Sequence, residues 1–441
     1  MTRPHVALTW MSTDQPTPRG GAVPILVLEA GVPDFLDLPW EHPIDDWQHH
    51  RLVDMPTGIH RHPVRFVAYG EGVYAIKELP RRLGEREYQV LDSLQERTTR
   101  SARPAALVIR PWAHPQSEQA SAVITGFVPH AFPYRNLVSG DGFGARRGQM
   151  LDAIAGLLVE LHLAGCFWGD CSLSNLLYRF DAGAIEAVMI DAETSAVYQS
   201  LSDGQRQHDL EIMRENLAGE MADLAAAHGT DLSQADFELG DDVILRYQGL
   251  WAELNQELVI TADEGFRIRE QLGRLNDLGF SVDDVVIEPV EGGNLVRLKA
   301  SVGGRTFNSG RLRELTGLRA SENQARIILG DLHYFLARLE ATTETEKRVG
   351  AVRWLVESFE PMVRRISAEW GGADPAQGYS DLLHHRLEMA KSRGSDVPNQ
   401  EAYDSWAAAG FPGFPLGSGD DVEDVPEIAS VLHGEGEGEG G

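Results

Sequence analysis

Residues 166–180 read CFWGDCSLSNLLYRF, and AIEAVMID follows at residues 184–191. Apolar residues between Met150 and Leu161 recur at helical spacing, which predicts a largely buried helix just before this stretch. We expect that helix to stop at Gly165, because glycine readily takes the left-handed conformation of a helix cap. Residues 184–191 are typical of a strand. The sequence therefore places a polar loop between a buried helix and a strand.

The polar loop carries Asp170 and Asn175, five residues apart, and Asp191 stands where the next strand ends. A carboxylate, an amide and a second carboxylate that converge at the ends of a hairpin suit a hard divalent cation, which prefers oxygen ligands. Capping of a turn by its own side chain explains either Asp170 or Asn175 alone. Turn capping does not explain why Asp170, Asn175 and Asp191 occur in this order after Lys77 and Glu87, which are described next.

A lysine and a glutamate lie upstream, where the sequence predicts a hairpin and a helix. VRFVAY and VYAIKEL flank a GEG turn, and their Val, Tyr, Phe and Ile content is typical of paired strands. Lys77 falls among apolar neighbours of the second strand, where an ammonium is costly unless it is paired. Glu87, on the inward face of a helix predicted over 86–95, can supply that partner. The alternative is an edge-strand lysine whose ammonium reaches water.

The order of elements favours an α+β protein with two lobes, because strands with one helix are followed mostly by helices. Beyond residue 230 the pattern predicts a second region, with a hairpin over 284–302 and helices near 241–258, 263–278, 321–341, 347–370 and 376–392.

The ordered set AIK, inward Glu87, D-x-x-x-x-N and strand-terminal Asp191 resembles the protein-kinase-like fold. In detail it is similar to the lipopolysaccharide kinase (Kdo/WaaP) family, in bacterial proteins that join such a domain to a C-terminal domain of unknown function. The likeness covers roughly residues 56–228. It implies a two-lobed kinase-like domain followed by a mainly helical accessory domain with a β-hairpin. We expect a leader and arm over 1–55, an N-lobe over 56–130, a C-lobe over 131–230, the accessory domain over 231–410 and a disordered acidic tail over 411–441.

This resemblance implies an ATP- and Mg²⁺-dependent phosphotransferase that acts on a hydroxyl of a small-molecule, sugar or lipid-linked acceptor. The catalytic residues would be Lys77, which holds the α/β-phosphates and pairs with Glu87, and Asp170, which orients or deprotonates the acceptor. Mg²⁺ would lie on Asn175 and Asp191. ATP would also contact Ala75, Arg61 and the hinge residues Gly126, Phe127 and Val128. Asp209 would support the catalytic loop from below.

The sequence also departs from the kinase pattern. No G-x-G-x-x-G precedes Lys77, the loop reads WGD in place of HRD, and Ser172 stands where a lysine is usual. Loss of that lysine removes one positive charge from the expected site of phosphoryl transfer. A pseudokinase or nucleotide-binding scaffold that recruits a protein partner through the C-terminal domain therefore stays open, as does transfer of AMP.

Composition narrows the classes of partner. The 441 residues carry 39 Lys and Arg against 67 Asp and Glu, a formal charge of −28, which argues against a nucleic-acid partner. No apolar stretch is long enough to predict a membrane span. The chain has two cysteines, Cys166 and Cys171, too few to stabilise a protein of this length by disulfides, so we expect a reducing, cytoplasmic location. A zinc site would need a fourth ligand and usually closer cysteines, so we expect both to be small apolar residues of the core.

Overall fold

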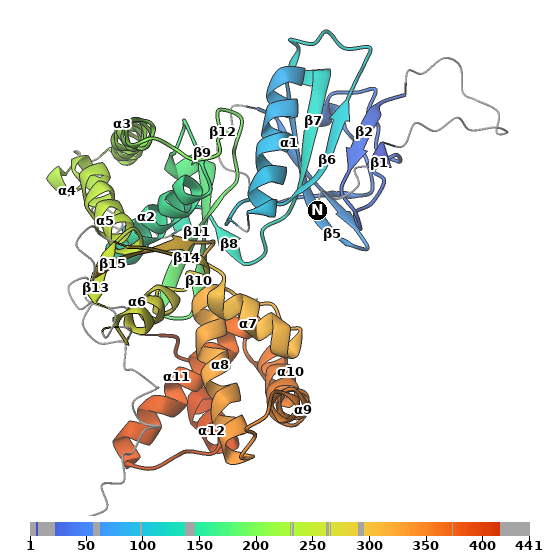
Figure 1. Ribbon diagram of the computed structural model, residues 1–441. Coiled ribbons are helices and arrows are strands. Elements are labelled where there is room, and N and C mark those ends of the chain that lie inside the picture. Colours follow the sequence, from blue (N-terminus) through green and yellow to red (C-terminus); the bar gives the residue numbers. More distant parts are fainter. Residues whose placement is uncertain are drawn as a thin grey trace, which may run out of the picture.

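The computed structural model describes residues 6–7, 23–55, 62–97, 99–136, 146–229, 231, 233–261, 264, 266–289, 295–372 and 374–414. Figure 1 shows a sheet-rich N-terminal lobe, a middle part of helices and short strands, and a helical C-terminal part. The expected α+β class is confirmed. No helix of the described residues is both long and apolar enough to cross a bilayer.

Antiparallel strands build the N-terminal lobe. Within the described residues they form a seven-stranded sheet in the order β1-β2-β6-β7-β5-β4-β3. Its elements are β1 (Val6–Ala7), β2 (Ile25–Leu28), β3 (Leu52–Val53), β4 (Val64–Tyr69), β5 (Gly72–Leu79), α1 (Arg81–Glu96), β6 (Pro104–Ile109) and β7 (Ser121–Gly126). The expected hairpin is present as β4 and β5. Pro80 ends β5 and starts α1 five residues earlier than the helix predicted from its apolar spacing.

The described residues before residue 56, which are β1 and residues 23–55, are part of this lobe. Ile25–Leu28 pairs with β6, and β3 pairs with β4. Phe35, Trp40 and Trp47 are buried against the sheet, so the arm covers one of its faces with apolar side chains.

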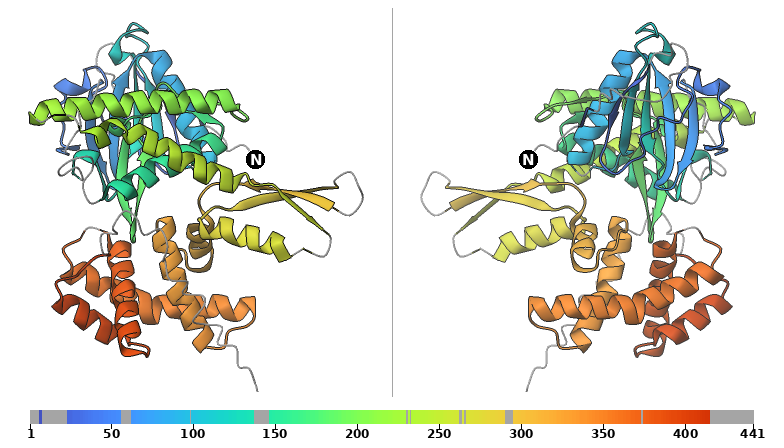
Figure 2. Two further views of the ribbon diagram at one scale, coloured as in Figure 1. Left: turned by 90° about the vertical axis from the view of Figure 1, so that its left-hand side faces the viewer. Right: turned by 90° about the vertical axis from the view of Figure 1, so that its right-hand side faces the viewer.

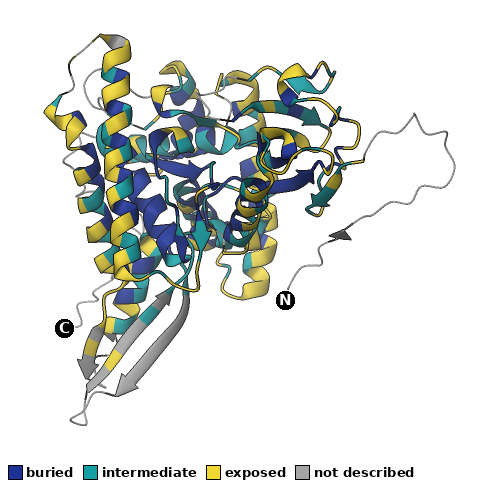
Figure 3. Ribbon diagram, turned by 90° about the horizontal axis from the view of Figure 1, so that it is seen from above, coloured by how far each residue is buried: buried dark blue, intermediate teal, exposed yellow. Residues whose placement is uncertain are grey.

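A buried helix, α2, and a hairpin, β10–β11, form the centre of the middle part. Its elements are β8 (Ala131–Phe132), α2 (Arg147–Leu163), β9 (Cys166–Phe167), β10 (Leu176–Asp181), β11 (Ala184–Met189), β12 (Ala196–Val197), α3 (Asp203–His228), α4 (Gln234–Phe237) and α5 (Leu239–Leu254). Figure 3 shows buried residues gathered at the centre and exposed residues along outer helix surfaces.

The core of the middle part continues past residue 230, where we expected a domain boundary. Val243 and Tyr247 of α5 belong to the same buried cluster as Leu157 of α2 and Leu217 of α3. The apolar pattern of α5 predicts a helix but does not say which neighbour it covers, so this packing was outside the reach of the sequence.

Next in the chain come a small sheet and a helical bundle. Among the described residues β13 (Leu258–Thr261), β14 (Val282–Pro289) and β15 (Leu295–Val302) form a sheet in the order β13-β15-β14, and with α6 (Phe266–Asp277) they project to one side (Figure 2). The bundle consists of α7 (Phe307–Thr316), α8 (Glu322–Arg338), α9 (Glu344–Trp354), a π-helical turn (Leu355–Phe359), α10 (Glu360–Glu369), α11 (Pro375–Arg393) and α12 (Asn399–Ala408).

The bundle has its own core, in which Trp354, Tyr379 and Trp406 are fully buried. Strand β13 and helices α7 and α12 were not predicted. Phe414, which we assigned to the tail, stacks on His384 with ring centroids 4.4 Å apart. The rest of the expected tail, from residue 415, lies outside the described residues.

Candidate active site

Lys77 lies where the two lobes meet. In β5 it pairs with Val64 of β4 and Val123 of β7, which places its side chain on the face covered by α1. Its Nζ lies 2.9 Å from Glu87 Oε2 of α1 and 2.9 Å from Asp191 Oδ2, which follows β11. The structure therefore brings together three residues that the sequence separates widely, and Lys77 does not face bulk solvent.

Charge in this group is unbalanced. Among the described side chains near Lys77, a third carboxylate, Glu193, lies 3.8 Å from Nζ. Burial lowers the pKa of Lys77, but the neighbouring carboxylates of Glu87 and Asp191 outweigh it and the pKa is raised. The pKa of Glu87 is raised to about 7, because burial and, to a smaller extent, repulsion from the Asp191 and Glu193 carboxylates outweigh the attraction of Lys77. The group carries more negative than positive charge, as a cation site requires.

His62 and Glu193 are site residues that the motifs did not identify. The buried imidazole of His62 lies with Nε2 2.9 Å from Glu193 Oε2 and Nδ1 2.5 Å from Glu118 Oε2. His62 and Glu118 belong to the N-terminal lobe and Glu193 to the loop after Asp191, so this contact also joins the lobes. The only signal in the sequence was the Ala-Glu that follows Asp191 in place of Phe-Gly.

The loop with Asp170 is held by amide side chains. Asn175 Nδ2 donates to Asp170 Oδ2 at 3.1 Å, and Asn216 Nδ2 of α3 donates to Asp170 Oδ1 at 2.8 Å. Glu220, one turn further along α3, accepts from the backbone N–H groups of Leu173 and Ser174. Asn216 was not predicted, although its spacing from Asp209 and Glu220 along α3 puts the polar residues on one helix face.

Asp209 supports the same loop from below, as expected. It is fully buried and accepts the backbone N–H groups of Trp168 at 2.7 Å and Gly169 at 2.8 Å, with His162 Nε2 3.1 Å away. Gly169 has φ +78°, which explains why glycine stands where protein kinases have arginine. The indole of Trp168 donates to the backbone oxygen of Asp191 at 3.1 Å, so the WGD loop and the Asp191 loop are linked.

The β10–β11 hairpin brings Asn175 and Asp191 to the same end. Leu176 pairs with Met189, and beyond this pair the N–H of Ile190 donates to the backbone oxygen of Asn175 at 3.0 Å. Asn175 precedes the hairpin and Asp191 follows it. The oxygens of Asp191, Asn175 and Glu193 are of the kind that Mg²⁺ prefers, and the surplus of carboxylate suits a divalent cation, so these residues fit the expected metal.

Besides Lys77, the structure describes Ala75 and the three hinge residues among the expected ATP contacts. Ala75 pairs with Thr125 of β7, and Gly126 pairs with Tyr74. The N–H of Phe127 donates to the backbone oxygen of Val73 at 2.9 Å, and Phe127 and Val128 are half-buried. Arg61 lies outside the described residues, as does the rest of the segment from 56 to 61.

Within the part of the chain that the structure describes, the cysteines and the other histidines make a weaker case for a metal site. Cys166 and Cys171 are buried free thiols, and burial raises the pKa of Cys166 to about 12. Among the described residues, one group has metal-ligand spacing: Asp37, His49 and His50, with donor atoms within 4.8 Å. Its carboxylate already accepts the Tyr69 hydroxyl at 2.5 Å and pairs with Arg51, whose positive charge opposes a cation.

Comparisons with known proteins find two matching stretches of the chain. Residues 72–239 match the family model of the lipopolysaccharide kinase (Kdo/WaaP) family, and residues 249–410 match that of a domain of unknown function, DUF4032. No curated protein matches the chain. Among solved structures it is similar to WaaP in complex with acyl carrier protein, with 15% identity, a TM-score of 0.33 and coverage of 57% of this chain and 98% of that chain. The expected resemblance is confirmed: one stretch of the chain matches the lipopolysaccharide kinase (Kdo/WaaP) family model, and a second, later stretch matches the DUF4032 model.

Proposed function

We propose that the chain is an ATP- and Mg²⁺-dependent phosphotransferase that acts on a hydroxyl of a small-molecule, sugar or lipid-linked acceptor. The observation that carries this proposal is the convergence of Glu87 and Asp191 on Lys77, each 2.9 Å from its ammonium. An ammonium fixed by a helix carboxylate can receive the phosphates of a nucleotide. The second carboxylate is then available to a metal.

The proposed roles follow from these positions. Lys77 binds the α/β-phosphates and Glu87 holds its ammonium in place. Asn175 and Asp191 bind Mg²⁺, which supplies charge stabilisation to the transferring phosphoryl group. Asp170, oriented by two amide donors, accepts the proton of the acceptor hydroxyl.

The adenine would lie between the lobes, against Ala75 and the hinge residues Gly126, Phe127 and Val128. Half-burial of these positions leaves part of their surface open to a base. We assign Arg61 to the phosphates, since no glycine-rich loop precedes Lys77.

A thermal-shift titration tests nucleotide binding. ATP with Mg²⁺ at 100 times its Kd should stabilise the wild type by about 2.7 kcal/mol. Lys77→Ala and Asp191→Ala should lose most of this gain. Lys347→Ala is the matched control, because Lys347 pairs with Glu344 on the exposed face of α9. Equal shifts in all variants, or no shift in the wild type, would contradict the proposal.

The second candidate is a pseudokinase or nucleotide-binding scaffold that recruits a partner through the C-terminal domain. Ser172 favours it, because a lysine at that position would add positive charge beside Asp170. ATP-dependent stabilisation without ATP consumption, unchanged in Asp170→Ala, would select the scaffold. If an acceptor is modified, its mass distinguishes phosphate from AMP.

A further inference from the structure

The β10–β11 hairpin has the candidate metal ligands at one end and contacts with the C-terminal bundle at the other. Its strands pair in continuous register from Leu176 with Met189 to Asp181 with Ala184. The turn that joins them contains Ala182 at φ +56°. Coupling between distant sites is carried by hydrogen-bond networks and rigid secondary elements, and this unbroken ladder connects the two ends of the hairpin.

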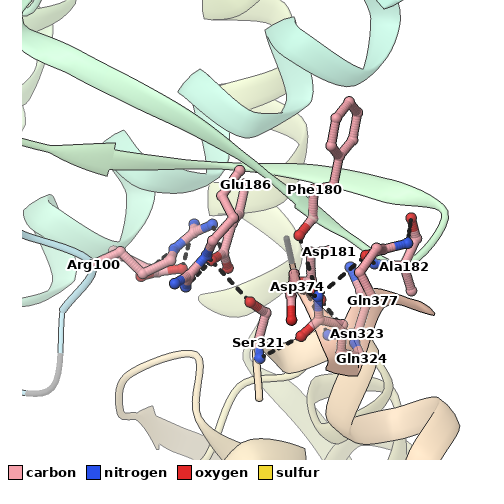
Figure 4. Close-up of polar contacts among 12 residues, drawn as sticks. Arg100, Phe180, Asp181, Ala182, Glu186, Ser321, Asn323, Gln324, Asp374 and Gln377 are labelled. Atoms are coloured by element: carbon pink, nitrogen blue, oxygen red, sulfur yellow. Dashed lines mark hydrogen bonds and ion pairs between the residues drawn. The ribbon is translucent and has the colours of Figure 1, made fainter. Parts of the chain in front are cut away.

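The far end of the hairpin caps a helix of the bundle. Asp181 is fully buried, and its carboxylate accepts the N–H of Asn323 at 3.0 Å and the N–H of Gln324 at 2.7 Å. Both belong to the first turn of α8, where N–H groups lack partners within the helix and the helix dipole favours negative charge. Figure 4 shows this contact between the hairpin and α8.

A second helix of the bundle holds the turn itself. Gln377, in the first turn of α11, accepts the N–H of Ala182 at 2.8 Å and donates to the oxygen of Ala182 at 3.3 Å. Gln324 Nε2 joins the two helices, since it donates to Asp374 Oδ2 and to Gln377 Oε1 (Figure 4). The turn therefore lies between two helix N-termini and is bonded to both.

The side of the hairpin is fixed by a buried ion cluster. Glu186 of β11 pairs with Arg179 of β10, lies 3.9 Å from Arg100 Nη1 and accepts the hydroxyl of Ser321 at 3.2 Å. Arg100 also binds Glu160 of α2 at 2.6 Å. These charges are removed from water, so a change in the hairpin's position would cost free energy unless the cluster stays paired.

From this geometry we propose that the DUF4032 domain positions the metal ligands of the kinase-like part through the β10–β11 hairpin. Asp181 and Gln377 are positioning residues: they touch no reacting group, and they set the angle at which the hairpin presents Asn175 and Asp191. This inference rests on the proposed metal site. By linkage, metal binding at one end of the hairpin strengthens the contact with the bundle at the other.

Metal affinity tests the inference in the full-length chain. Mn²⁺ binding is followed by its EPR signal, and ATP binding is measured separately in EDTA. Asp181→Asn and Gln377→Leu should raise the Kd for Mn²⁺ about threefold to tenfold. The Kd for ATP without metal should not change, because Lys77 lies on the other lobe. Circular dichroism checks the fold, and Gln377→Leu carries the test if Asp181→Asn does not fold.

Thr343→Ala is the matched control. It removes a side-chain cap from α9 of the same bundle, where Thr343 Oγ1 accepts the N–H of Glu346 at 3.2 Å, and it does not touch the hairpin. Exchange of the Ile190 amide, which bonds to Asn175, should accelerate in Asp181→Asn and stay unchanged in Thr343→Ala.

An unchanged Kd for Mn²⁺ in both hairpin variants, or an equal loss in Thr343→Ala, would overturn the inference. A wild type that binds no Mn²⁺ would instead reject the proposed metal site, and with it the positioning role. The two failures are therefore distinguishable.

Discussion

Lys77 Nζ and Asp191 Oδ2 lie 2.9 Å apart, across 114 residues of sequence and across the two lobes. The contact joins a central strand of the N-terminal sheet to the loop that leaves β11. With Glu87 on its other side, the ammonium is shared between a residue of its own lobe and one of the opposite lobe. Changes to this small group should therefore affect lobe stability and ligand binding differently.

The pH dependence of stability should report on Glu87. Its pKa is raised from 4.5 to about 7, so the folded state binds this proton more tightly than the unfolded chain does. The resulting stabilisation is complete below about pH 4.5 and is lost as pH rises through 7. It amounts to roughly 3 kcal/mol. In the wild type, this contribution makes the urea midpoint higher at pH 5 than at pH 8. The difference between the two midpoints should be smaller in Glu87→Gln.

Two other buried carboxyls, Asp181 and Asp381, have pKa values raised to about 6 and about 7, so the wild type changes in the same direction through them. The informative quantity is thus the difference between wild type and variant. Glu85→Gln, a matched change on the same helix, is the control. Parallel curves for wild type and Glu87→Gln would refute the assignment.

Metal affinity should depend on Glu193. If Mg²⁺ binds at Asp191, the Glu193 carboxylate is close enough to contribute charge, because both acids lie near Lys77 Nζ. Glu193→Gln should weaken Mn²⁺ binding about tenfold. Glu118→Gln is the matched control, since Glu118 contacts the opposite side of His62. Equal Mn²⁺ affinities in wild type and Glu193→Gln, measured by calorimetry, would exclude this role.

The order of residues in the sequence was enough to bring Lys77, Glu87 and Asp191 together, because each stands on an element whose type and direction its neighbours dictate. Asp209 was identified by the resemblance to the protein-kinase-like fold. The contact between His62 and Glu193 was not predictable, since Glu193 stands where the motif departs from the kinase pattern and His62 lies in no periodic segment or motif. Only the approach of the two lobes brings them together.

Several helix and strand positions followed from apolar spacing, whereas the partners of those elements did not. The pattern of α5 shows which face is buried but not that α2 covers it. In the sequence Asp181 only precedes Ala182 and Gly183, a pattern typical of a turn. Its role as a cap of α8 depends on where a helix more than 140 residues later begins.

Gly84 should tolerate no side chain. It lies within α1, and an added Cβ would lie much closer to Ser121 Oγ than van der Waals contact allows. The Ser121 hydroxyl is held in place, because it donates to the backbone oxygen of Leu79 at 2.7 Å. Gly84→Ala should therefore destabilise the protein by about 1–3 kcal/mol in urea unfolding, despite the higher helix propensity of alanine. Gly219→Ala in α3, where nothing lies within 4 Å, should instead stabilise by up to about 1 kcal/mol. A gain in both variants would show that Ser121 adapts without cost.

Asp209 should be the most sensitive position beneath the WGD loop. Asp209→Ala leaves the buried N–H groups of Trp168 and Gly169 without their acceptor, so unfolding free energy should fall by roughly 3 kcal/mol or more. Asp203→Ala, at the start of the same helix, should cost less than about 1 kcal/mol, because Asp203 is 97% exposed where it pairs with Arg206. Asp209→Asn keeps one acceptor oxygen, so its loss should lie between the two in chemical denaturation. Similar losses for Asp209→Ala and Asp203→Ala would mean that the loop finds other partners and that Asp209 does not support it.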